Sequence, residues 1–157
     1  MTIDKNFWKN KKVFLTGHTG FKGGWLSVLL NHLEVEIFGF SLEAEKKSFF
    51  NQAKVASIVH HNIGDIRDMS SLLKSENSFK PEILIHMAAQ PLVIESYKDP
   101  VTTYSSNVMG TVNILELIRQ SSSIKSVLVP CAKLNLLDIS YHLFCLAMNC
   151  SFFKIKS

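Results

Sequence analysis

The run VFLTGHTGFKGGWL, residues 13–26, decides the fold that this sequence predicts. A short apolar, β-rich segment leads into a glycine-spaced turn, and the turn leads into residues 25–30, which have the apolar spacing of a buried helix start. Gly17 can adopt backbone angles closed to other residues, Gly20 leaves room for a ligand beside the main chain, and Gly23 lets the helix pack closely on the strand. Free N–H groups and the helix dipole would suit a pyrophosphate there. We therefore expect a strand, a phosphate-binding loop and a helix.

The identity of any ligand is left open by this loop alone. Its spacing is GxxGxxG rather than the GxGxxG of the common dinucleotide-binding pattern, and a tight turn without a ligand is the alternative. An acidic residue about 20 residues beyond such a loop binds the adenosine ribose in dinucleotide folds. Ser41 stands at the expected strand end and Glu43 follows it, so Glu43 is the candidate ribose ligand. Lys46 and Lys47 could equally accommodate a 2′-phosphate, so NADP is an alternative to NAD. A solvated turn that binds no ribose is a further alternative for this segment.

The rest of the chain alternates expected strands with expected helices. Its apolar patterns predict strands at residues 34–40, 58–63, 81–89 and 125–129, and helices at residues 49–57, from residue 69, and at 101–120. This alternation gives a doubly wound parallel sheet, the Rossmann α/β fold. We expect one such domain over residues 1–129 and an apolar tail without a domain of its own over residues 130–157. Gly17, Asp65, Ala88 and the end of the fifth strand would define the ligand edge.

Two other polar positions follow from this scheme. Asp65 comes directly after the third strand and could accept a hydrogen bond from an adenine amino group, whereas Asp68 could cap the next helix. His60 and His61 are interpreted as strand residues, because no cysteine or carboxylate lies at metal-ligand spacing from them. No metal site is predicted.

The long helix over residues 101–120 carries apolar residues at helical spacing. They are Val108, Val112, Leu115 and Ile118. We expect them to face the core or a partner helix, with Asn107 as the polar residue on the inner side. This helix is therefore the surface through which a homodimer could form.

Composition and charge argue against several classes of protein. A length of 157 residues with 46% hydrophobic content predicts a globular domain, and the net charge of +4 is too dispersed to favour nucleic-acid binding. No apolar stretch of signal-peptide length precedes the glycine loop, and the three cysteines form no CxxC pair, so we expect a cytoplasmic protein. The apolar run over residues 134–153 contains Asp138, His142 and Asn149, which disfavours a membrane helix.

Six motifs together resemble those of the extended short-chain dehydrogenase/reductase family, which includes NAD-dependent epimerases and dehydratases. They are residues 16–23 (TGHTGFKG), 64–68 (GDIRD), 86–93 (HMAAQPLV), 96–97 (SY), 99–100 (DP) and 107–111 (NVMGT). The first and third are similar to the corresponding loops of nucleotide-sugar 4,6-dehydratases that act on CDP-glucose. The resemblance covers about residues 10–129.

The resemblance implies an NAD-dependent lyase acting on CDP-glucose or a related nucleotide sugar. Hydride would leave C4 of the hexose, water would leave across C5 and C6, and hydride would return to C6. The resulting 4-keto-6-deoxy sugar would serve bacterial surface polysaccharides such as lipopolysaccharide O-antigen. The implied site residues are Gly17, Thr19, Gly20, Phe21, Lys22 and Gly23 at the pyrophosphate, Asp65 and Ile66 at the adenine, Ala88, Ala89 and Gln90 at the ribose and phosphate region, and Asn107 in support of catalysis.

The sequence departs from the family after the fifth expected strand. The family places Thr-(Ser/Thr)-Asp-Lys-Cys-Tyr there, and further on a Tyr-x-x-x-Lys pair whose lysine lowers the pKa of the tyrosine base. Lys133 falls at the lysine of the first motif, but Cys131 and Ala132 replace its hydroxyl and its acid. Cys145 stands where lysine should follow Tyr141.

Family-like residues up to about Val129, followed by unrelated sequence, would result from a truncated gene or a shifted reading frame. The edge of the sheet after the fifth strand would then be open. Three functions stay open: the NAD-binding half of a dehydratase, inactive alone; a non-catalytic nucleotide-binding module that pairs with an intact homologue; or another NAD(P)-dependent epimerase or reductase.

Overall fold

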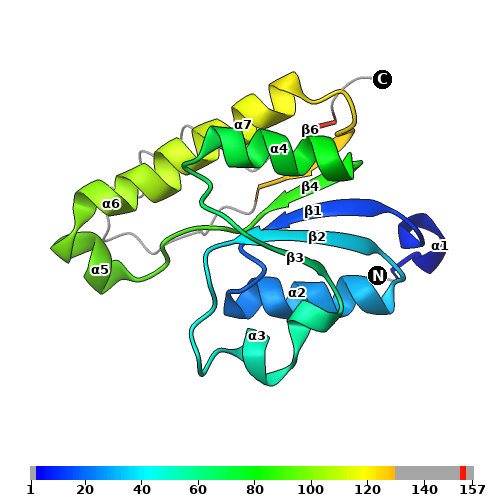
Figure 1. The fold of residues 1–157 in the computed structure, drawn as a ribbon, viewed down its shortest axis with the longest axis horizontal. Helices are drawn as coiled ribbons and strands as arrows, with labels where there is room; N and C mark the ends of the chain where they lie inside the picture. The colour runs from blue at the N-terminus through cyan, green and yellow to red at the C-terminus, as the bar shows by residue number, and fades with distance from the viewer. Residues whose placement is uncertain (1–2, 130–152, 155–157) are drawn as a thin grey trace.

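A mainly parallel sheet forms the centre of the chain in a computed structural model that describes residues 3–129 and 153–154 (Figure 1). The strands are β1 (Lys12–Thr16), β2 (Glu36–Ser41), β3 (His60–Ile63), β4 (Ile83–His86), β5 (Ser126–Leu128) and β6 (Phe153–Lys154). Their spatial order is β3-β2-β1-β4-β5-β6, and β1 pairs in parallel with both β2 and β4. The chain therefore builds the sheet outward from β1 in both directions, which confirms the predicted doubly wound α/β fold.

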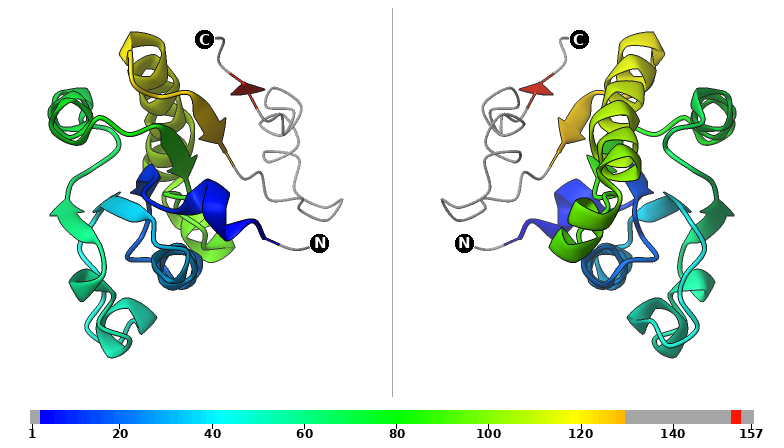
Figure 2. Two further views of the ribbon diagram at one scale, coloured as in Figure 1. Left: turned by 90° about the vertical axis from the view of Figure 1, so that its right-hand side faces the viewer. Right: turned by 90° about the vertical axis from the view of Figure 1, so that its left-hand side faces the viewer.

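The outermost strand differs from the expectation of an open edge. β6 pairs with β5 in the antiparallel direction, Ser126 opposite Lys154 and Val127 opposite Phe153. Its backbone groups thus cover part of the edge of β5 that was expected to be unpaired. The left view of Figure 2 shows β6 beside β5.

Helices cover both faces of the sheet. They are α1 (Lys5–Trp8), α2 (Phe21–His32), α3 (Phe49–Gln52), a 3-10 turn η1 (Val55–Ser57), α4 (Met69–Phe79), α5 (Val93–Lys98), α6 (Pro100–Tyr104), a π-helical segment η2 (Ser105–Met109) and α7 (Gly110–Gln120). α2 and α3 lie on one side, and α4 and α7 on the other (Figures 1 and 2). Asp68 accepts from the backbone N–H groups of Ser70 and Ser71, as predicted for the cap of α4. Within the described ranges, none of these helices is long and apolar enough to span a bilayer.

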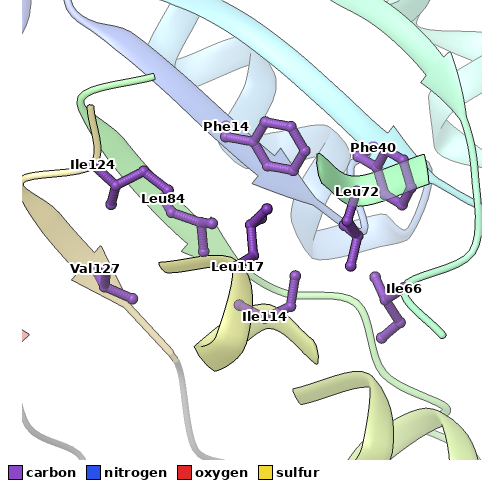
Figure 3. Packing of buried hydrophobic residues seen from close by; sticks show 9 residues of the cluster. All are labelled: Phe14, Phe40, Ile66, Leu72, Leu84, Ile114, Leu117, Ile124 and Val127. Carbon is purple, nitrogen blue, oxygen red and sulfur yellow. The ribbon is translucent and has the colours of Figure 1, made fainter. Parts of the chain in front are cut away.

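Alternate side chains along the central strands pack into two separate hydrophobic clusters, one on each face of the sheet. Phe14 of β1 joins the cluster under α4 and α7, drawn in Figure 3, whereas its neighbours Val13 and Leu15 join the cluster under α2. The same alternation places Leu84 of β4 in the first cluster and Ile85 in the second. Central parallel strands buried on both faces read as continuous apolar runs, which is why the sequence pattern located them.

The apolar residues predicted to face the core or a partner helix along the long helix do not all line the core, although Ile118 packs against the first cluster. Val112 is 46% exposed and Leu115 is 39% exposed, and the side of α7 that faces the core instead carries Ile114 and Leu117. The physical reason is Gly110, where an added Cβ would lie 2.4 Å from Cδ1 of Ile66. Because this glycine brings the helix close to Ile66, it fixes which side of α7 is buried.

The start of α2 also differs from the prediction. The helix begins at Phe21, so Gly23 and Gly24 lie inside it, and Trp25 is half exposed. A Cβ on Gly24 would lie 2.9 Å from the Phe49 ring, which stacks on Trp25 with 4.6 Å between ring centroids. α3 is therefore anchored on α2 by an aromatic stack seated over a glycine. The helix α5 (Val93–Lys98) was not among the helices predicted from the sequence.

Two histidines are buried within the sheet region, His18 just after β1 and His86 at the end of β4. Burial lowers the pKa of His86 to about 4, and burial together with the neighbouring ring of His61 lowers the pKa of His18 to about 4. Both rings are therefore neutral in the folded protein near neutral pH.

These two rings predict a loss of stability on mild acidification. The unfolded chain protonates both near pH 6.5 but the folded protein does so near pH 4, so stability falls as the pH decreases across this window. Between pH 7 and pH 5 we expect each ring to cost about 2 kcal/mol of unfolding free energy. Urea titrations at both pH values measure this. His86→Gln should reduce the pH dependence of the unfolding free energy; an unchanged pH dependence in this variant would contradict the assignment.

Candidate nucleotide-binding site

The loop after β1 is held against the loop after β4 by backbone contact. Gly17 has a φ of 76°, and an added Cβ would lie 2.6 Å from the backbone nitrogen of Ala88. Both the left-handed conformation and the lack of space require glycine here. The two loops thus form one continuous surface at the end of the strands where parallel sheets bind ligands.

The other two glycines of the motif differ in their surroundings. A Cβ on Gly23 would lie 2.1 Å from the carbonyl oxygen of Gly17, so this glycine lets α2 pack directly on the loop. A Cβ on Gly20 would meet nothing nearer than the same oxygen at 3.4 Å, which leaves open space over this residue. Gly20 is the N-cap of α2 and makes no side-chain cap, so the first N–H groups of the helix are available to an anion.

Thr19 connects this loop to the end of β2. Its hydroxyl donates to the carbonyl of Leu42 (3.0 Å), and the hydroxyl of Ser41 therefore donates to Thr19 Oγ1 (2.7 Å). Because the Thr19 hydroxyl is used internally and the residue is buried, its predicted contact with a cofactor is left to its backbone.

His18 connects the loop to β3, a contact that no sequence pattern indicated. Its Nε2 lies 2.7 Å from Nδ1 of His61. The ring rests on Gly39 of β2, where a Cβ would approach it to 2.5 Å. His60 and His61 lie in β3 as predicted. Among the described residues no group of three or more His, Cys, Asp or Glu side chains could hold a metal ion.

The predicted adenine residues follow β3. Both carboxylate oxygens of Asp65 accept from the guanidinium of Arg67, at distances between 2.6 and 3.0 Å, and these hydrogen bonds lower the pKa of Asp65. The side chain of Ile66 points into the core toward Gly110, and its carbonyl accepts from Asn113 (3.0 Å). Only the backbone N–H of Ile66 is left to face a ligand.

Other predicted residues lie on the surface near this edge. Glu43, Lys46 and Lys47 are exposed on the segment between β2 and α3. Phe21 and Lys22 are exposed in the first turn of α2, where the Phe21 ring packs edge-on against Phe49 with centroids 5.8 Å apart. Lys133, Cys131, Tyr141 and Cys145 lie outside the described residues.

Asn107 is joined to the segment after β4. Its side-chain oxygen accepts from the backbone N–H of Gln90 (2.7 Å), and its amide donates to the Gln90 carbonyl (3.1 Å). Asn107 occupies the π-helical segment η2, a distortion that is frequent at functional sites. Ala88 is half-buried and Ala89 exposed, so small side chains line the surface between Gln90 and Gly17.

Behind this surface lies a buried series of hydrogen-bonded side chains that the sequence analysis did not predict. Thr16 and His86 end adjacent strands in register, and their side chains are 2.7 Å apart; His86 also reaches Thr111 of α7 (3.2 Å). The available signal was two polar residues at the last positions of otherwise apolar strands.

Comparisons with known proteins agree with this arrangement. A family model described as GDP-mannose 4,6 dehydratase matches residues 14–132. CDP-glucose 4,6-dehydratase of Salmonella typhimurium is 52% identical over 126 residues, which make up 80% of this chain and 35% of that enzyme. GDP-mannose 4,6-dehydratase of Vibrio cholerae is 32% identical over 120 residues, 69% of this chain and 31% of that enzyme.

A solved structure, UDP-glucose 4-epimerase from Brucella ovis in complex with NAD, covers 76% of this chain at a TM-score of 0.66 and 25% identity. This chain covers 35% of that structure, and it spans about a third of the length of the curated relatives described above. Because the family model matches well over half of the sequence, the chain belongs to the GDP-mannose 4,6-dehydratase family.

Proposed function

We propose that this chain is the dinucleotide-binding part of a nucleotide-sugar 4,6-dehydratase, with NAD as its cofactor and CDP-glucose as the sugar nucleotide. The observation that carries the proposal is the open space over Gly20 beside the uncapped N-terminus of α2. The choice of CDP-glucose is supported by the 52% identity to an enzyme named for that substrate. The choice of NAD is supported by a structural neighbour of 25% identity that carries NAD.

The pyrophosphate fits the loop because three features coincide there. Gly20 lets the phosphate oxygens approach the main chain, and the first turn of α2 offers unpaired N–H groups with the positive end of the helix dipole. The exposed ammonium of Lys22 adds a full positive charge at the same turn. Gly17 and Gly23 maintain the shape of the loop, because a side chain at either position would collide with the neighbouring backbone.

The adenosine would extend toward the ends of β2 and β3. Arg67 shares its Nε–H between the two oxygens of Asp65 and donates from Nη2 to Oδ2, so an adenine amino group would compete with Arg67 for this carboxylate. The backbone N–H of Ile66 suits a ring nitrogen. Glu43 would accept from the ribose hydroxyls. NADP is the second candidate, since Lys46 and Lys47 on the same segment could pair with a 2′-phosphate.

NAD, when bound, supplies a hydride acceptor for C4 of the sugar and returns that hydride at C6. This chain's residues bind and orient: Ala88 and Ala89 leave room for a flat ring at the sheet edge, and Gln90 is held by Asn107. None of the three tyrosines in the sequence is followed by lysine four residues later. A phenolate base of the family's kind is therefore not supplied, and we propose that the 157-residue chain binds the dinucleotide without turnover.

We also propose that a second copy of the chain covers the apolar side of the long helix. Five large apolar residues are exposed along α6, η2 and α7. They are Val101, Tyr104, Met109, Val112 and Leu115. Exposed apolar patches of this extent mark interaction surfaces. A two-fold pairing would let one helix bury its stripe against the same stripe of its partner.

Cofactor binding is tested at Gly20. Gly20→Ala adds a methyl group at an ordinary φ of −73° and in open space, so the fold should keep its thermal midpoint. The methyl group would occupy the space of the pyrophosphate, and NAD binding measured by calorimetry should weaken about tenfold or more. Unchanged affinity at unchanged stability would place the dinucleotide elsewhere. Titration with NADP in parallel decides between the two cofactors.

Turnover is tested with the purified 157-residue chain. We expect it to bind NAD and to release no 4-keto-6-deoxy product from CDP-glucose, because the Tyr-x-x-x-Lys base is missing. The product's carbonyl is detected by mass and by absorbance in alkali. Product formation would refute the inactivity, and co-purification with a longer homologous subunit would favour a pairing module instead.

Dimer formation is tested with charge on the exposed stripe. Val112→Glu with Leu115→Glu places like charges opposite one another in a two-fold pair, so the dimer dissociation constant from sedimentation should rise about tenfold or more. Leu29→Glu, an equally exposed leucine on α2, is the matched control and should leave it unchanged. A parent chain that is monomeric at all accessible concentrations would contradict the proposed dimer.

A further inference from the structure

His86 lies at the meeting point of three elements. Thr16 and His86 are register partners on β1 and β4, and both side chains point to the same face as Phe14 and Leu84, toward α7. The His86 ring is 5% exposed and contacts Thr16 through Nδ1 (2.7 Å) and Thr111 through Nε2 (3.2 Å). Its hydrogen bonds thus join β1 to α7 across the end of β4.

The direction of these hydrogen bonds follows from counting donors. Thr16 Oγ1 accepts from the backbone N–H of Ala88 (3.2 Å) and from that of Met87 (3.1 Å), which it shares with the Thr16 carbonyl. The single hydrogen of the Thr16 hydroxyl is then left to point at Nδ1 of His86. Since Nδ1 accepts, the neutral ring carries its proton on Nε2 and donates it to Thr111.

From Thr111 the chain of hydrogen bonds continues to the candidate site. The Thr111 hydroxyl donates to the carbonyl of Asn107 (2.6 Å), and the Asn107 side chain holds both backbone groups of Gln90. Gln90 follows Ala88 and Ala89, and Ala88 returns to Thr16. The hydrogen bonds therefore close a ring around the loops after β1 and β4, and each hydroxyl and the imidazole has one orientation in it.

The neutral ring is enforced by its surroundings. The pKa of His86 is lowered to about 4 by burial alone, and no charged group of the described residues contributes to this shift. A proton on Nδ1 would point at Thr16 Oγ1, which already accepts two N–H groups. The cationic form is thus opposed by hydrogen bonding as well as by burial.

We propose that His86, as the neutral Nε2–H tautomer, is a positioning residue that holds Asn107 against Gln90 and thereby fixes the Ala88–Gln90 surface for the nucleotide. This inference rests on the proposed function for its consequence, because the nucleotide is what the surface would receive. The positioning itself is independent of that function and has its own readout.

The first experiment reads the tautomer in the unmodified chain and uses a variant only to assign the signals. Long-range ¹H–¹⁵N spectra of the imidazoles, assigned by loss of one signal set in His86→Gln, should give His86 the Nε2–H pattern from pH 8 down to pH 5.5. The Nδ1–H pattern, or a cationic ring at pH 7, would overturn the inference. Addition of NAD should leave the tautomer unchanged.

The second experiment compares two amide replacements. In His86→Asn the new side-chain oxygen would replace Nδ1 and keep the Thr16 contact, whereas His86→Gln places an amide N–H near the position of Nε2 and keeps the Thr111 contact. Hydrogen exchange of the Gln90 backbone N–H should accelerate about tenfold in His86→Asn and in Thr111→Val, and stay close to the parent in His86→Gln. Ser75→Ala, which removes a buried hydroxyl bonded to Asn62 on another part of the sheet, is the control and should not change it.

NAD affinity then connects the two proposals. It should fall about tenfold in His86→Asn and in Thr111→Val but not additively in the double variant, since both interrupt one path. Unchanged hydrogen exchange of the Gln90 N–H in His86→Asn, in Thr111→Val and in the double variant would overturn the positioning role. If Gln90 responds as expected while the parent chain binds no NAD, the positioning holds and the proposed function fails. A variant that does not fold is identified by its far-UV spectrum, and the tautomer of the unmodified chain then decides.

Discussion

The contact between the backbones of Gly17 and Ala88 is the constraint on which the rest of the site depends. With 2.6 Å between a hypothetical Cβ and the Ala88 nitrogen, no other residue can occupy position 17 while the two loops stay together. Gly23 repeats the constraint on the other side, where α2 rests on the Gly17 carbonyl. One peptide unit is thus enclosed by the central strand, the neighbouring strand's loop and the helix. The N–H groups at the start of α2 are aimed by this packing rather than by any ligand.

Side-chain hydrogen bonds then attach the same loop to the strands on both sides. Thr16 reaches β4 through His86, while His18 reaches β3 and Thr19 reaches the end of β2. These bonds lie in a buried setting, where an unmade bond costs more than a made bond gains. Thr16, His18 and Thr19 thus tie the loop to three neighbouring strands, although Nδ1 of His18 is buried without a hydrogen-bond partner among the described residues. Glycine gives the loop its shape.

Much of the fold could be predicted from the sequence because central parallel strands and the glycine loop have strong local patterns. The central strands are apolar on both faces, as at residues 13–15 and 84–85. The cap of α4 is predictable because Asp68 directly precedes the helix. The buried side of α7 could not be predicted, since Val112 and Leu115 are as apolar as Ile114 and Leu117. The choice was made by Gly110 meeting Ile66, a contact across 44 residues of sequence that no helical periodicity records. The bond from Asn107 to Gln90 was missed for the same reason, although Asn107 itself was singled out.

The aromatic stack over Gly24 joins the two segments that are proposed to contact the dinucleotide. In the proposed function, phosphate contact would depend on backbone geometry around Gly17, Gly20 and Gly23. Contact with the ribose would depend on side chains of the segment before α3, which is fastened to α2 through Phe49 and Trp25. Exposed residues of that segment can be exchanged without altering the packing of the glycines. Under the proposed function, a change of preference between NAD and NADP would therefore require substitutions in the segment before α3 and none in the glycine loop.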